Sequence, residues 1–149
     1  MPTPIKLVSL DIDGTLYEPK GSAFDAKKLA AFQLLAKKLR SKGITPIICT
    51  GKPASYVEAF AEAYGLVGKG ASHICEHGAV ILVYDYWPPR DIDVAKLYGT
   101  KDYGELQKIA DAIIKQTGAT TNEKTATFSI HPKEIFVTDE FYRKVVGVM

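Results

Sequence analysis

A short apolar stretch that ends in two closely spaced carboxylates is the feature that most constrains how this chain can fold. Residues 5–10 form a nearly continuous apolar run, and Asp11, Asp13, Gly14 and Thr15 follow it almost directly. Such a run is typical of a strand buried in a parallel sheet. We therefore expect a fully buried strand that leaves the sheet at Asp11, with both carboxylates at its carboxyl end. Open α/β sheets bind their ligands at that edge.

The segments that follow alternate between helix and strand patterns. Ser22–Asp25 resembles a capping box, and the apolar spacing after it predicts a helix that stops at Gly43. Ile44–Cys49 predicts a second buried strand, and Pro53 is expected at the first position of a helix that ends at Gly65. The predicted buried faces of the two helices are Phe32, Leu35, Ala36 and Leu39, and Val57, Phe60, Ala61 and Tyr64. Strand–helix–strand–helix order favours a parallel sheet with right-handed crossovers.

The second half of the chain gives a weaker pattern. Ser72–Cys75 and Ala79–Tyr84 predict two strands around a tight turn at Glu76–Gly78, and the pattern breaks at Trp87–Arg90, where we place a domain boundary. Beyond it we expect three elements, which are a helix from Asp102 to Gly118, a half-buried strand over Thr125–Ile130 and a short helix from Asp139 to Val146.

Composition excludes several classes of function. The chain has 149 residues, enough for one ordinary domain with a small appendage, and its net charge of +2 comes from 19 basic and 17 acidic residues that are interspersed. This balance does not favour a nucleic-acid surface. No apolar run is long enough to span a membrane, and the first residues lack a signal-peptide pattern, so we expect a cytoplasmic protein. Cys49 and Cys75 are expected as free thiols, although a disulfide is left open.

The two acids have three interpretations. Acids often end strands as turn residues. A calcium loop would need Gly at its sixth position and Glu at its twelfth, where this chain has Leu16 and Ser22, so that interpretation fails. In the third, Thr50 and Gly51 offer a hydroxyl and backbone N–H groups for an anion at the end of the next strand. A metal-binding acidic strand end beside an anion-binding one would form a phosphate site.

These residues resemble a known family. Asp11–Leu16, Ile48–Pro53 and Cys75–Ala79 are similar to the N-terminal half of a haloacid dehalogenase-superfamily phosphatase, close to the phosphoglycolate and sugar-phosphate phosphatases of the Cof type. The resemblance implies a Rossmann-like three-layer α/β fold with a parallel sheet. Residues 1–86 would form the incomplete core, and residues 87–149 would form part of an α/β cap.

The resemblance also implies a chemistry. Asp11 would be the nucleophile and a Mg²⁺ ligand, and Asp13 would be the general acid and base, with its backbone carbonyl on the metal. Thr50, Gly51 and Lys52 would bind the phosphoryl group, with Lys52 where the family usually has Arg. Glu76 and His77 would lie in a substrate loop, with His77 where related phosphatases usually have Asn. The expected substrate is a small phosphorylated metabolite such as phosphoglycolate.

Two elements of the family pattern do not occur in a matching context, namely a later Lys and an acidic loop that completes the magnesium shell. Lys133 and Lys144 lie in the cap-like part, and Asp91 and Asp93 are expected to be surface acids. The cap-like part is expected to end before the cap is complete, which would leave the catalytic strand near an open sheet edge and favour association. The alternatives are therefore a non-catalytic truncated paralogue, or a fragment whose site a partner chain or a second copy completes.

Overall fold

A computed structural model describes residues 4–18, 24–85, 88–94, 103–122, 127, 129–131 and 139–148. The chain divides into two compact units, Met1–Val94 and Ala95–Met149. The boundary that the sequence predicts after residue 86 falls at residues outside the described ranges, so it stays a prediction. The site considered below lies entirely within the first unit. No helix in the described ranges is both long and apolar enough to cross a membrane.

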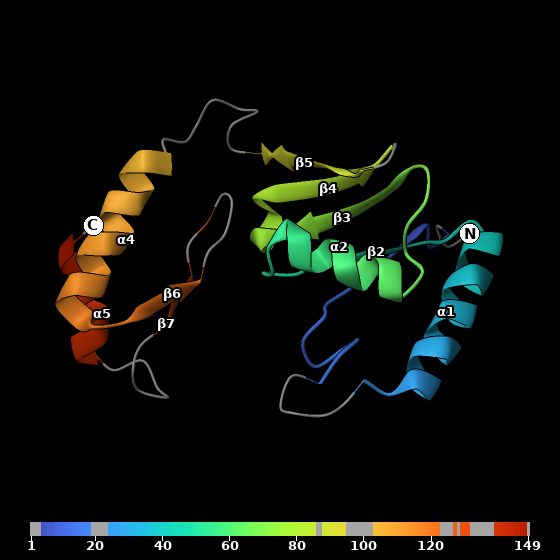
Figure 1. The fold of residues 1–149 in the computed structure, drawn as a ribbon, viewed down its shortest axis with the longest axis horizontal. Helices are drawn as coiled ribbons and strands as arrows, with labels where there is room; N and C mark the ends of the chain where they lie inside the picture. The colour runs from blue at the N-terminus through green and yellow to red at the C-terminus, as the bar shows by residue number, and fades with distance from the viewer. Residues whose placement is uncertain are drawn as a thin grey trace. The chain divides into compact units, whose positions relative to one another are not determined.

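The first unit combines helices and strands, and β3, β4 and β5 lie side by side in it (Figure 1). Its first two strands are parallel. Strands β1 and β2 pair in parallel with Leu7 opposite Thr45 and Leu10 opposite Ile48, and one parallel bridge from Cys49 to Ile74 joins β2 to β3. Strands β3, β4 and β5 pair antiparallel in that order. The elements are β1 (Leu7–Leu10), α1 (Ala26–Ser41), β2 (Thr45–Ile48), α2 (Ala54–Ala63), β3 (Ala71–Cys75), the 3₁₀ turn η1 (Glu76–Gly78), β4 (Val80–Tyr84) and β5 (Arg90–Asp93).

The helices begin and end at residues that the sequence marks. Asp25 caps α1, because its carboxylate accepts hydrogen bonds from the N–H groups of Lys27 and Lys28 at 2.9 and 3.2 Å. Ser22, the other end of the predicted capping box, lies outside the described residues. Pro53 is the N-cap of α2 with extended backbone and is not its first helical residue, which corrects the prediction by one position. The predicted inner face of α2, Val57, Phe60, Ala61 and Tyr64, is buried.

The predicted burial of the first strand is wrong. Leu7 is 51% exposed, Ser9 is exposed, and Val8 and Leu10 are only half-buried. Among the described residues β1 pairs with β2 alone, so its other edge has no strand beside it. The predicted inner face of α1 is also only partly right, since Ala36 is buried while Leu35 is exposed. Both errors have the same cause, because the apolar pattern of a segment does not say which neighbours will cover it.

Strand β5 is a second difference from the sequence prediction. Arg90–Asp93 pairs with Val80–Val83 of β4, although three of its four residues are charged. Asp91 is exposed, as expected, but Asp93 is half-buried. Charged residues are tolerated here because the strand lies at the edge of its antiparallel sheet.

In its described residues the second unit has two helices and a two-stranded sheet. The predicted helix after residue 102 is confirmed. The predicted strand over Thr125–Ile130 lies partly outside the described residues, and Ser129 and Ile130 at its end belong to a strand that pairs antiparallel with Thr120–Asn122. Asp102 itself lies outside the described residues. The elements are α4 (Tyr103–Thr117), β6 (Thr120–Asn122), β7 (Ser129–His131) and α5 (Asp139–Val148).

A buried imidazole joins the two halves of the sheet in the first unit. His73 on β3 is fully buried, and its Nδ1 accepts a hydrogen bond of 3.1 Å from the backbone N–H of Ile48 on β2. Burial lowers the pKa of His73 to about 4, since a charged imidazole would lose its hydration there. The ring therefore stays neutral and supplies an acceptor where β2 and β3 share only one backbone bridge.

Candidate active site

Three parallel strand ends bring the predicted site residues together. Asp11 follows β1, Thr50 comes two residues after β2, and Glu76 follows β3. Backbone hydrogen bonds join the three segments, since the Cys49 N–H donates to the Leu10 carbonyl at 2.8 Å and the Thr50 N–H donates to the Ile74 carbonyl at 3.0 Å. The fold thus places the acids, the predicted phosphate loop and the predicted substrate loop at one edge of the sheet.

The acidic loop is a tight turn built around Ile12, which is fully buried. The Ile12 carbonyl accepts hydrogen bonds from the N–H groups of Thr15, Leu16 and Tyr17 at 3.2, 3.0 and 2.9 Å. Gly14 has a φ of 75°, a left-handed conformation that glycine adopts without strain. Asp11 accepts a hydrogen bond of 2.7 Å from the Ile12 N–H. The turn therefore fixes the backbone that carries both carboxylates.

The residue that follows helix α2 contacts this acidic loop. The Tyr64 hydroxyl, just after the end of α2, donates a hydrogen bond to the Leu16 carbonyl. Tyr56, Phe60 and Tyr64 stack along the helix, with ring centroids 5.0 and 5.8 Å apart. These rings lie at successive turns of one helix face. The row of rings extends from the predicted phosphate loop to the loop of Asp13.

Lys52 forms an ion pair with Asp13. Its Nζ lies 2.9 Å from Asp13 Oδ2, with both side chains a little over one-third exposed, and 5.2 Å from the centre of the Tyr56 ring. The hydrogen bond to Asp13 outweighs partial burial and raises the pKa of Lys52, and the charge of Asp11 adds to the effect. The second oxygen of Asp13, Oδ1, is buried and has no partner among the described residues.

The predicted phosphate loop leaves a backbone donor free. Thr50 is buried, and its Oγ1 accepts a long hydrogen bond of 3.4 Å from the Lys52 N–H. The Gly51 N–H has no acceptor among the residues that the structure describes. With no side chain of its own, Gly51 lets a neighbouring group approach its backbone, and Thr50–Lys52 comes just before the first turn of α2.

The turn at Glu76 and His77 closes over that loop. The Glu76 N–H donates to the Lys52 carbonyl at 3.0 Å, and the His77 N–H donates to the Thr50 carbonyl at 3.1 Å. The His77 ring lies so close to Gly51 that a Cβ there would be 2.3 Å from its Cε1 and Nε2 atoms. Only glycine fits at position 51 while His77 keeps this position.

Both residues of this turn have left-handed backbone. Glu76 has a φ of 49° and His77 a φ of 57°, and Glu76 is fully buried. Each such conformation is costly for a residue with a Cβ, and strained residues cluster at functional sites. The two backbone hydrogen bonds to the phosphate loop explain how the turn is held in this shape.

The residues present fit a magnesium ion in part. Mg²⁺ is usually held by one or two carboxylates, with water and substrate phosphate as its other ligands. The Asp11 carboxylate and the Asp13 backbone carbonyl would be its protein ligands, and the Asp13 side chain, whose buried Oδ1 has no partner among the described residues, would be left for proton transfer. No group of three or more His, Cys, Asp or Glu side chains that could hold a metal occurs in the described part of the chain.

The other candidate residues lie on other elements or outside the described residues. Lys144 lies on α5 in the second unit and pairs with Glu140 at 2.7 Å, and Lys133 lies outside the described residues. Although the residue is exposed overall, partial loss of hydration at its carboxyl and the nearby charge of Glu76 raise the pKa of Asp91. Sequence reasoning missed the Lys52–Asp13 pair and the Tyr64–Leu16 contact. The helical spacing of Tyr56, Phe60 and Tyr64 was the only signal for the latter.

Comparison with known proteins identifies the family. Residues 8–88, more than half of the chain, match the profile of the haloacid dehalogenase-like hydrolases. The chain therefore belongs to the haloacid dehalogenase-like hydrolase family, as the sequence motifs predict. It is 30% identical over 146 residues to a candidate phosphatase of Streptococcus pyogenes serotype M6, covering 93% of this chain and 51% of the relative.

Solved structures share the fold. The chain superimposes with a TM-score of 0.60 and 18% identity on a Thermoplasma acidophilum protein, covering 94% of this chain and 56% of that one. For a sugar phosphatase of haloacid dehalogenase subclass IIB the TM-score is 0.52 with 18% identity, covering 84% of this chain and 43% of that one. The chain thus spans about half the length of these relatives.

Proposed function

We propose that this chain carries the nucleophile and phosphate-binding half of a Mg²⁺-dependent phosphomonoester hydrolase. The substrate would be a small phosphorylated metabolite such as phosphoglycolate, and the reaction would pass through an aspartyl-phosphate. The observation that carries the proposal is the meeting of three strand ends, where the segments of Asp11, Thr50 and Glu76 come together and Lys52 pairs with Asp13. Two free thiols, Cys49 and Cys75, agree with a reducing, cytoplasmic location.

The residues support a two-step reaction. In the first step an Asp11 oxygen attacks phosphorus, the P–O ester bond breaks, and protonated Asp13 gives its proton to the departing alkoxide. In the second step Asp13 takes a proton from water, which attacks the same phosphorus and releases phosphate from Asp11. Thr50, Gly51 and Lys52 would stabilise the negative charge on the phosphoryl oxygens in both steps. A magnesium ion held by Asp11 and Asp13 would neutralise further charge there.

Replacing Asp11 tests the nucleophile. We expect Asp11→Asn to lower the rate at which the full chain hydrolyses p-nitrophenyl phosphate with Mg²⁺ by about 100-fold or more, since an amide cannot attack phosphorus. Asp111→Asn, on the exposed face of α4, is the matched control and should keep the wild-type rate. Equal rates for Asp11→Asn and wild type would refute the mechanism.

A non-catalytic or complemented chain is the second candidate. It is favoured because, in the described part of the first unit, no group of three or more side chains is placed to hold a metal and no lysine other than Lys52 pairs with the acids. If the wild-type chain shows no turnover at any pH, but gains it when a partner chain from the source is added, this second candidate is correct and the chain is one part of an assembled site.

A further inference from the structure

Lys52 has two competing anionic partners at this site. Its backbone belongs to the predicted phosphate loop, directly after the free N–H of Gly51, while its ammonium group lies 2.9 Å from Asp13 Oδ2. A phosphoryl group bound at Thr50 and Gly51 would therefore be next to a cation that is already paired.

The ion pair between Lys52 and Asp13 forms in the structure, and its free energy is small enough for it to open. Both side chains are a little over one-third exposed, and ion pairs of this kind change an equilibrium by at most about fivefold. An ammonium on a flexible four-carbon stem can turn to a new acceptor, whereas the planar fork of Arg is more constrained. The ring of Tyr56, 5.2 Å from Nζ, keeps the cation near the loop while it changes partner.

We propose that Lys52 exchanges partners, binding Asp13 when the site is empty and the phosphoryl oxygens when a phosphate group occupies it. Phosphate binding would then release the Asp13 carboxylate for its proton-transfer steps. This inference rests on the proposed function for its purpose, but the exchange itself concerns phosphate binding alone. A phosphate dianion carries more negative charge than one carboxylate, so it competes well for the same ammonium group.

A double-mutant cycle tests the exchange without turnover and without metal. Inorganic phosphate is titrated into the full chain by calorimetry for wild type, Asp13→Asn, Lys52→Met and the double variant. We expect Lys52→Met to weaken phosphate binding about fivefold or more, because the phosphoryl oxygens lose their cation. We expect Asp13→Asn to tighten binding about threefold when Lys52 is present, because no ion pair must open. In the Lys52→Met background the gain should be distinctly smaller.

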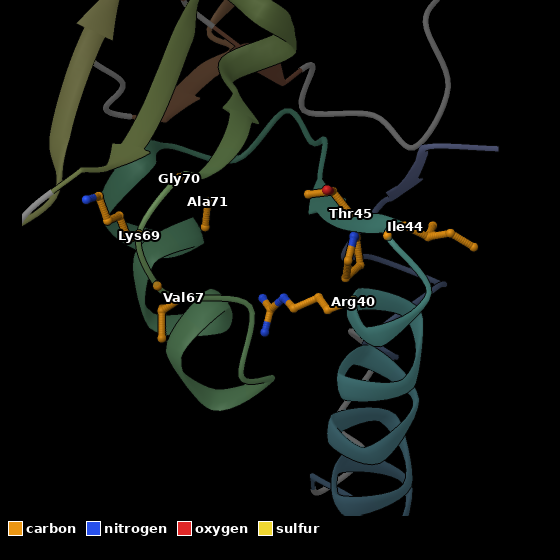
Figure 2. Close-up of a pocket in the computed structure, with 10 residues that line it drawn as sticks. Arg40, Ile44, Thr45, Val67, Lys69, Gly70 and Ala71 are labelled. Atoms are coloured by element: carbon orange, nitrogen blue, oxygen red, sulfur yellow. The ribbon is translucent and has the colours of Figure 1, made fainter. Parts of the chain in front are cut away.

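A second cation serves as the control. Lys69 lies at the opposite edge of the sheet, where it lines a pocket of about 410 Å³ with Arg40 at the amino ends of β2 and β3 (Figure 2). Lys69→Met removes the same charge and should leave phosphate affinity unchanged. If it weakens binding as much as Lys52→Met does, the effect is one of overall charge or of that pocket, and the proposal is wrong.

The remaining outcomes separate the exchange from the proposed function. An equal gain from Asp13→Asn in both backgrounds would mean that the two side chains act independently, and it would overturn the exchange even in an active enzyme. The same holds if neither wild type nor Asp13→Asn binds phosphate. Coupling between the two positions in a chain that hydrolyses nothing would support the exchange while refuting the proposed function.

Discussion

At the scale of single residues, Gly51 and His77 determine the shape of the predicted phosphate loop. The imidazole fills the space that a side chain at position 51 would need, and the left-handed turn at residues 76 and 77 aims it there. The loop therefore depends on a small residue at one position and a strained one at another. Neither Gly51 nor His77 could exchange places with an adjacent residue without changing the shape of the loop.

Adding one methyl group tests this arrangement. Gly51→Ala would place a Cβ 2.3 Å from the His77 ring, so the ring or the backbone must move. We expect a loss of about 1–3 kcal/mol in the free energy of unfolding in urea, together with weaker binding of inorganic phosphate. Gly147→Ala, where the added methyl group meets open space, should do neither.

Rescue distinguishes a clash from a general effect of alanine. Adding His77→Gly to Gly51→Ala removes the ring and suits the left-handed backbone, so stability should return. If Gly51→Ala is as stable as wild type and binds phosphate equally well, the close packing of His77 on Gly51 does not matter in solution.

The sequence predicted residue types at the site better than their contacts. Asp11, Asp13, Thr50 and Gly51 could be recognised because the end of an apolar run places them at a strand tip. The Lys52–Asp13 pair could not, since it joins side chains that are 39 positions apart and depends on how α2 packs. The roles of all these residues stay predictions until activity is measured.

At the scale of elements, β1 is poorly covered in the first unit. Leu7 is 51% exposed and Ile5 is 70% exposed, and within the described residues only β2 pairs with the strand. The period of the apolar residues predicted β1, β2, α1 and α2 because it depends on local geometry. The burial of β1 and the existence of β5 could not be predicted, because both depend on distant strands.

An open strand edge favours association, and a charge on it should oppose association. We propose that two copies of the chain meet at β1. Leu7→Lys should shift the concentration-dependent mass measured by light scattering towards the monomer. Leu34→Lys, which places the same charge on an exposed position of α1, should have little effect. A wild-type chain that stays monomeric over a wide range of concentrations would contradict this.

At the scale of the whole molecule, the neutral His73 makes stability depend on pH. Its pKa is about 4 in the folded chain, below the value of 6.5 expected when it is exposed. As the pH falls, the unfolded chain takes up the proton first. The contribution of His73 is therefore complete above pH 6.5 and is lost as the pH falls towards 4.

The pH dependence of stability that His73 causes can be tested with a variant that has no titrating side chain at position 73. The difference between the two pKa values corresponds to a loss of about 3 kcal/mol in the free energy of unfolding between pH 6.5 and pH 4. Urea unfolding at several pH values would measure this loss. His73→Asn keeps a hydrogen-bond acceptor and should flatten this part of the curve, while His131→Asn, at an exposed position of β7, should not. Parallel curves for wild type and His73→Asn would show that His73 is protonated equally in both states.

The contact between Tyr64 and Leu16 requires α2 to have a fixed length. The helix begins at the predicted phosphate loop, and the tyrosine just beyond its end donates a hydrogen bond to the loop of Asp13. One residue added to or removed from α2 would shift Tyr64 by about 1.5 Å along the axis and turn it by about 100°, away from Leu16. The number of residues between Lys52 and Tyr64 is thus set by the distance between two loops, and substitutions along α2 are tolerated more readily than changes in its length.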